Sequence, residues 1–119
     1  MILLCASVAT AVAAPDVGQL AKDRVAAAEK AYRNAVAAQQ AGRGTVETMC
    51  HWSVRWLDSE LDASKPKKQV LTDHVTRMTE LEAELVKQRN AGKVTGADVE
   101  TAAYFRIEAE LWQARGKAH

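Results

Sequence analysis

The sequence predicts an all-α protein built from a duplicated antiparallel helical hairpin, arranged as an up-down-up-down four-helix bundle. The first observation behind this prediction is composition. Of 119 residues only six are Gly and two are Pro, while about one in five is Ala. So few helix breakers among abundant helix formers are typical of long helices and exclude an all-β fold. The second observation is an internal repeat with a period of 50 residues.

The repeat becomes visible when the sequence is shifted by 50 positions and compared with itself. Identical residues then meet in nine pairs: Gln19/Gln69, Asp23/Asp73, Val25/Val75, Val36/Val86, Ala41/Ala91, Gly42/Gly92, Thr45/Thr95, Glu60/Glu110 and Leu61/Leu111. We therefore divide a single helical domain, residues 14–119, into two repeats at about 16–65 and 66–116. Each repeat is expected to be a helix, a tight turn and a second helix, and such short turns make neighbouring helices antiparallel.

Residues 1–13 are expected to be a cleaved secretory signal peptide. The segment is uncharged, apolar and rich in small residues, and Ala11-Val12-Ala13 has the small-x-small form that signal peptidase accepts. Cleavage after Ala13 is favoured, because cleavage after Ala14 would leave Pro15 directly beyond the cut. The alternative is an ordinary buried helix at the start of the chain. Export would place the protein in the periplasm or cell envelope of a bacterium.

Cysteine usage follows from this cleavage. Cys5 leaves with the signal peptide, so Cys50 is the single thiol of the mature chain and no internal disulfide can form. Such a thiol is either buried or joined to another chain, and we expect burial because Cys is among the residue types most often found in protein interiors.

The first helix, at about residues 16–41, is so rich in Ala that it offers little apolar bulk. Gly42 stands where a left-handed C-terminal cap is needed, and Thr45 can cap the second helix. Gly92 and Thr95 repeat this chemistry in the second hairpin. Lys65-Pro66 separates the repeats, because the residue before proline is pushed out of the helical region. The third helix carries a coiled-coil-like stripe of Leu71, His74, Met78, Leu81 and Leu85.

The second and fourth helices each carry two apolar ribs. One rib is expected to be a packing surface common to both repeats: Ser53, Val54, Leu57 and Leu61, matched by Ala103, Tyr104, Ile107 and Leu111. The other rib needs a further neighbour, a groove or a partner chain. On this second rib we expect the partner-binding residues to be Met49, Trp52, Trp56, Phe105 and Trp112. The alternative is that these aromatic side chains supply the bulk that the Ala-rich helix lacks.

Neither catalysis nor a cofactor is expected. The sequence has no Gly-rich phosphate loop, no Gly-x-Ser-x-Gly elbow and no His-Glu-x-x-His. Sixteen basic and fifteen acidic residues give a net charge of +1, which provides no electrostatic reason to expect a nucleic acid partner. No stretch of the mature chain reaches the roughly 20 apolar residues that a transmembrane helix needs.

A metal site is the alternative function. His74 and Met78 are four residues apart and share a helix face, and Cys50 and His51 add a thiol and a second imidazole. However, adjacent residues on a helix point about 100° apart, so Cys50 and His51 cannot readily bind one ion together. Packing is the competing interpretation for His74 and Met78.

The second turn has a recognisable pattern. Gly92, Thr95 and Asp98 form a Gly-x-x-Thr-x-x-Asp turn that opens an Ala-rich helix. This pattern resembles the periplasmic helices of TolC-type outer-membrane efflux proteins, which also carry a duplicated helical unit. The first repeat keeps the Gly and Thr but has Thr48 in place of the Asp, and the chain lacks alternating strands for a membrane barrel. The resemblance implies an efflux-associated helical protein and transfers no catalytic or cofactor residue.

We therefore expect an exported, non-catalytic α-helical scaffold or protein-interaction module of the cell envelope. Its partner is expected to be protein, with a homo-oligomer as one option. The alternative is a periplasmic metal-binding or metal-sensing helical bundle.

Overall fold

A computed structural model describes residues 14–119 and contains four α-helices in that range. They are α1 (Val17–Gln40), α2 (Val46–Asp62), α3 (Lys67–Asn90) and α4 (Gly96–Arg115). No strand occurs between residues 14 and 119, so the predicted all-α class is confirmed. The expected signal peptide, residues 1–13, lies outside the described residues.

The turns of the two hairpins begin with the same geometry. α1 and α3 are each 24 residues long and begin 50 positions apart. Gly42 and Gly92 follow these helices with φ of 77° and 72°, a region that side chains other than that of glycine rarely adopt. Their N–H groups donate to the carbonyls of Gln39 and Arg89, each at 2.9 Å. The predicted glycine turns are therefore present in both hairpins.

The helix starts are capped as the sequence predicts. The side chains of Thr45 and Thr95 accept hydrogen bonds from backbone N–H groups in the first turns of α2 and α4. The Thr95 N–H in turn donates to the Asp98 carboxylate at 3.0 Å, which completes a capping box. Between the hairpins, Pro66 stands at the N-cap of α3, where its missing N–H costs nothing.

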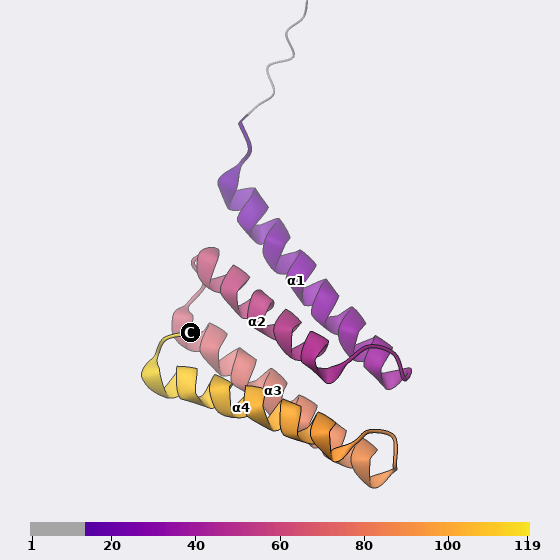
Figure 1. Ribbon diagram of the computed structural model, residues 1–119. Helices are drawn as coiled ribbons and strands as arrows, with labels where there is room; N and C mark the ends of the chain where they lie inside the picture. Colours follow the sequence, from indigo (N-terminus) through magenta and orange to yellow (C-terminus); the bar gives the residue numbers. More distant parts are fainter. Residues whose placement is uncertain (1–13) are drawn as a thin grey trace, which may run out of the picture.

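α2 is the central helix of an open bundle. Figure 1 shows α1, α2 and the α3/α4 pair as successive layers, with consecutive helices running antiparallel. α2 packs against all three other helices, whereas the only close backbone contacts of α1 within the described chain are with α2. The predicted up-down-up-down order is therefore present, but α1 and α4 stand on opposite sides of α2 instead of closing a ring.

The core lies where α2 packs onto the α3/α4 hairpin. The larger cluster of buried residues consists of Val46, Met49, Cys50, Met78, Leu81, Leu85, Ala102, Phe105 and Ala109. A smaller cluster near the other end of these helices consists of Leu57, Val70, Leu71 and Trp112. The whole predicted α3 stripe is buried, and the predicted burial of Cys50 is confirmed.

The expectation that α2 and α4 bury the same rib is wrong. Leu57 of α2 is fully buried, but its counterpart Ile107 in α4 is 55% exposed. Phe105 and Trp112 are buried instead, on the opposite side of α4. This difference in burial arises from the positions of α2 and α4 in the bundle. α2 has helices on two sides and can cover both of its ribs, whereas α4 contacts α3 and α2 on one side only.

Candidate interaction surface

Three of the five predicted partner-binding residues belong to the core. These are Met49 of α2 and Phe105 and Trp112 of α4. They are buried because the faces that carry them pack together where α2 meets the α3/α4 hairpin. In this folded state they are enclosed by the chain itself, and a role for these three side chains in partner binding stays a prediction. Trp52 and Trp56 are half-buried.

Trp56 fills space between α1, α2 and α3. The Arg77 guanidinium lies 4.0 Å from the Trp56 ring centroid, within the range of a cation–π contact. The Tyr32 ring packs against Trp56 from α1 at a centroid distance of 5.8 Å. This arrangement matches the alternative interpretation of the tryptophans, in which aromatic bulk compensates for the small side chains of the Ala-rich helix.

Trp52 is half-buried on α2, with a basic side chain over its ring. The Arg55 guanidinium is 4.6 Å from the Trp52 ring centroid. No other aromatic ring stacks on Trp52 among the described residues. A role for Trp52 in partner binding therefore stays a prediction.

Three of the exposed large apolar side chains in residues 14–119 lie together on α4, and the others are Val17 and Leu20 of α1 and Val86 of α3. Tyr104, Ile107 and Leu111 are 61%, 55% and 43% exposed. Their spacing of three and four residues aligns them in one row along the helix, about 10 Å long at 1.5 Å per residue. We call these three residues the α4 row. It lies on the side of α4 opposite the core residues, so α4 is apolar on two faces, only one of which is covered.

Charged side chains frame the α4 row. Glu100 lies one turn before it and Arg115 one turn after it, and both are exposed. Neither takes part in an ion pair among the described residues. Arg106, by contrast, is held by Glu82 and Glu110 at 2.9 and 3.0 Å on the flank towards α3. The side chains at the two ends of the row are therefore available to a partner.

The α4 row is visible in the sequence as an apolar rib, but the neighbour expected for it is absent among residues 14–119. The rib was recognised from its spacing, and its match to Val54, Leu57 and Leu61 suggested a shared packing role. One local signal for exposure was present in the sequence. Tyr104 replaces Val54, and its hydroxyl, which donates to Glu108 at 3.3 Å, is a polar group suited to the surface.

A buried polar network ties α2 to α3. The Arg77 Nε donates to the Ser53 hydroxyl at 2.8 Å, and the Ser53 hydroxyl lies 2.8 Å from His74 Nδ1. When the neutral His74 ring carries its proton on Nε2, the Ser53 hydroxyl donates to Nδ1 while it accepts from Arg77. Burial, reinforced by the Arg77 charge, lowers the pKa of His74 to about 3. Ser53 is fully buried, so this Ser–His contact is not open to a substrate.

The candidate metal ligands are not gathered into one site. Cys50 is buried, and burial raises the pKa of its thiol to about 12. His74 and Met78 are buried in α3, whereas His51 is exposed and lies 3.3 Å from the Glu47 carboxylate. Within residues 14–119 no three His, Cys, Asp or Glu side chains come close enough to hold one ion.

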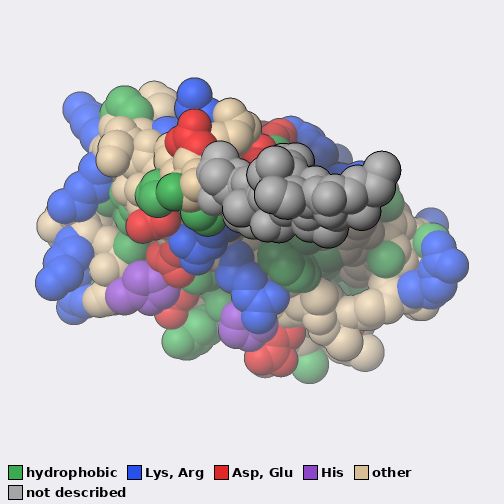
Figure 2. Space-filling view, turned by 90° about the horizontal axis from the view of Figure 1, so that it is seen from above, with side chains coloured by type: hydrophobic (Ala, Val, Ile, Leu, Met, Phe, Trp, Pro, Cys, Tyr) green, Lys and Arg blue, Asp and Glu red, His purple; other side chains and the backbone are tan. Residues whose placement is uncertain are grey.

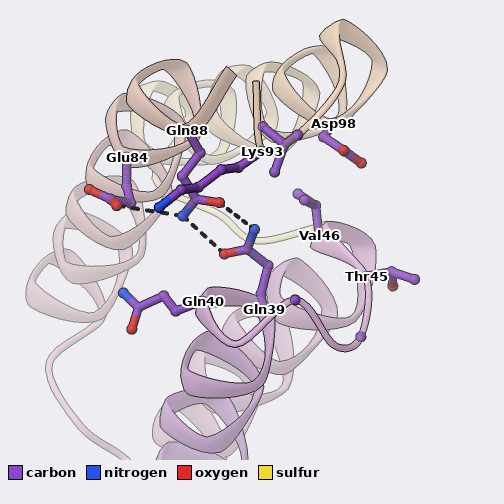
Figure 3. Close-up of a pocket in the computed structure, with 11 residues that line it drawn as sticks. Gln39, Gln40, Thr45, Val46, Glu84, Gln88, Lys93 and Asp98 are labelled. Atoms are coloured by element: carbon purple, nitrogen blue, oxygen red, sulfur yellow. Dashed lines mark hydrogen bonds between the residues drawn. The ribbon is translucent and has the colours of Figure 1, made fainter. Parts of the chain in front are cut away.

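Three cavities open between the hairpins, namely one of about 480 Å³ between α1 and α3 and two larger ones. One, of about 600 Å³, lies at the turn end, where the Gln39 and Gln88 amides exchange hydrogen bonds of 2.6 and 3.2 Å across it (Figure 3). The other, of about 560 Å³, lies between α2 and α4 beside Phe105 and Trp112. Because the side-chain amides of Gln39 and Gln88 are hydrogen-bonded to each other, neither offers the cavity at the turn end an amide without a partner.

Charge is evenly mixed over the visible surface. Figure 2 shows Lys and Arg side chains interspersed with Asp, Glu and apolar ones, in keeping with the net charge of +1. On this face no large patch of a single charge sign is present that could steer a highly charged partner. None of the helices in residues 14–119 is long and apolar enough to cross a membrane.

No family model, curated protein or solved structure matches this chain. The resemblance of its turn to TolC-type helices therefore stays a prediction.

Proposed function

We propose that this protein is a non-catalytic α-helical interaction module that acts as a scaffold in the bacterial cell envelope. The α4 row is the observation that supports the proposal. Single exposed apolar residues are ordinary on protein surfaces, but Tyr104, Ile107 and Leu111 share one helix face and lie opposite the core. A row with this spacing is the kind of surface onto which another helix packs.

The size of the row is sufficient for a measurable contribution to binding. Fully burying an Ile or Leu side chain stabilises by roughly 1.5–3 kcal/mol, so covering the exposed half of each contributes about 1 kcal/mol. Tyr104 adds an aromatic ring with a polar tip, a combination enriched at interfaces. The three residues together account for roughly 2–4 kcal/mol of association free energy, or about 30- to 1,000-fold in affinity.

Other functions have less support. Catalysis would need an accessible group of polar side chains, and the Ser53–His74 pair is buried. A metal-binding role would need donors that meet, whereas Cys50 and His51 lie in different environments. An efflux-associated role rests on the Gly92–Thr95–Asp98 turn alone, and it adds a cellular context to the interaction module.

Site-specific photo-crosslinking in living cells tests the proposed function. A photoreactive phenylalanine at position 107 should give a discrete crosslinked species, because this position lies at the centre of the α4 row. The same probe at Leu20 is the matched control, since Leu20 is 54% exposed but lies on α1. If position 107 gives no more crosslinking than position 20, the interaction module is refuted. N-terminal sequencing of the protein from a periplasmic fraction tests export, with Ala14 expected as the first residue.

A further inference from the structure

We propose that the α4 row binds the α4 row of a second copy of this chain, with the two α4 helices antiparallel around a two-fold axis near Ile107. This inference rests on the proposed function and identifies the partner. Its support is the charge at the two ends of the row, on a face of α4 that no helix of residues 14–119 covers.

The chain itself shows what covers a rib of this kind. In the first repeat Val54, Leu57 and Leu61 occupy the positions of the α4 row. Leu57 is fully buried, and Val54 and Leu61 pack against the Leu57 cluster, all where α2 docks onto the α3/α4 hairpin. One copy of this rib is therefore already covered by helices of the same chain, while the copy in α4 has no helix over it among residues 14–119.

Charge at the ends of the row selects the antiparallel orientation. With the axis near Ile107, Tyr104 faces Leu111 of the second copy, and Glu100 of each chain faces Arg115 of the other. A parallel arrangement would instead place Glu100 against Glu100 and Arg115 against Arg115. Opposite charges at both ends favour the first arrangement, and like charges disfavour the second. Because one surface meets itself, the association closes at two chains.

The flanks of α4 are compatible with this approach. On the α3 side, Glu110 is paired with Arg106, so that its charge is balanced within the chain. On the α2 side, Glu108 accepts the Tyr104 hydroxyl and stays at the edge of the contact. A single pair of helices buries less than the roughly 1,200 Å² of a standard interface, so we expect a weak dimer with a dissociation constant of about 1–100 μM.

Analytical ultracentrifugation of the mature protein is the direct test, with reductant present to keep Cys50 as a thiol. Over about 1–200 μM the wild type should pass from monomer to dimer. Ile107→Glu and Leu111→Glu should each weaken the dimer roughly tenfold or more. Leu20→Glu is the control, since it places the same charge at a similarly exposed apolar position outside α4 and should leave the dimer unchanged. Circular dichroism verifies that each variant stays folded.

A charge exchange then tests the orientation. Glu100→Arg and Arg115→Glu should each weaken the dimer, by roughly two- to tenfold, because two like-charge contacts form per dimer. The double variant should restore wild-type affinity. A dimer that survives Ile107→Glu, a trimer, or a wild type that is monomeric at the highest concentration overturns the second copy as the partner. Failure of the double variant to restore affinity overturns the antiparallel orientation.

The outcome separates this inference from the proposed function. A monomer in the centrifuge together with a crosslink from position 107 to a different protein overturns the second copy but retains the interaction module. Absence of both association and crosslinking refutes the two together.

Discussion

Acidification should destabilise this protein through one buried histidine. His74 is almost completely buried, its ring stacks on Trp112 at a centroid distance of 5.8 Å, and its Nε2 has no hydrogen-bond partner among residues 14–119. Its Nδ1 accepts from Ser53, which Arg77 also contacts. A proton added to Nδ1 would break the hydrogen bond from Ser53 and place a positive charge beside the Arg77 guanidinium. The folded state therefore strongly favours the neutral ring.

The sign and size of the effect follow from the pKa. The pKa of His74 falls from 6.5 to about 3 on folding. Between pH 6.5 and pH 3 His74 is protonated in the unfolded chain but neutral in the folded chain. Its contribution to the free energy of unfolding is therefore fully present above pH 6.5 and is lost as the pH falls towards 3. The loss is about 1.4 kcal/mol per pH unit, or roughly 2 kcal/mol between pH 7.5 and pH 5.

Urea unfolding followed by circular dichroism at pH 7.5 and pH 5 measures this loss. His74→Asn removes the titration while keeping an oxygen that can accept from Ser53, and the difference in stability between the two pH values should shrink by roughly 2 kcal/mol. Every other titratable group is present in both proteins and contributes equally to both. An unchanged pH dependence in His74→Asn would refute the reasoning.

Three further predictions concern the rib, the turn and the thiol. Leu57→Ala should lower the free energy of unfolding by about 2–5 kcal/mol, whereas Ile107→Ala at the matching position should cost less than about 1 kcal/mol; equal costs in urea unfolding would contradict the burial difference. Gly92→Ala should destabilise the protein by roughly 1 kcal/mol, because the φ of Gly92 is 72°. Gly96→Ala, inside the first turn of α4, should not destabilise it. Similar melting temperatures for the two variants would argue against strain in the turn. Cys50 should react with a thiol reagent slowly in the folded protein and rapidly in urea, because it is buried and its pKa is raised to about 12; fast labelling of the folded protein would show that the core opens.

The buried network has a structural role beyond its pH dependence. Ser53 and Arg77 belong to α2 and α3, and Arg77 also lies between Ser53 and the Trp56 ring. The ribs of these helices are built from similar aliphatic residues and could pack in several registers. In any register that separated Ser53 from Arg77, buried polar groups would lose their hydrogen bonds, and the packed state would be less stable. We therefore expect Ser53 and Arg77 to help select the observed register of α2 on α3.

Local chemistry made most of the fold predictable. Gly42 and Gly92 terminate helices because they can adopt positive φ, and Thr45 and Thr95 start helices because their side chains accept from the next turn. These effects act over a few residues, so they can be recognised in the sequence. The α3 stripe was predictable for a related reason, since a helix that packs along one side must place its apolar residues every three or four positions.

The candidate site was predictable only in part. The row of Tyr104, Ile107 and Leu111 was recognised as an apolar rib, but the partner role was given to Phe105 and Trp112 on the other face. Periodicity shows that a helix has an apolar face and leaves open which of two such faces meets a neighbour. The hydrogen bond between Ser53 and His74 was equally out of reach, because it joins residues 21 positions apart on different helices.

The sequence by itself thus determined the helices, their ends, the two hairpin turns and the alternation of chain direction, since each depends on neighbours within a few positions. Tertiary structure alone decided that α2 is central and α4 is at the edge. That choice buries Leu57 and exposes Ile107, although the two residues stand at equivalent positions of the repeat. Burial depends on which helix lies opposite, and this is a property of the whole packed chain.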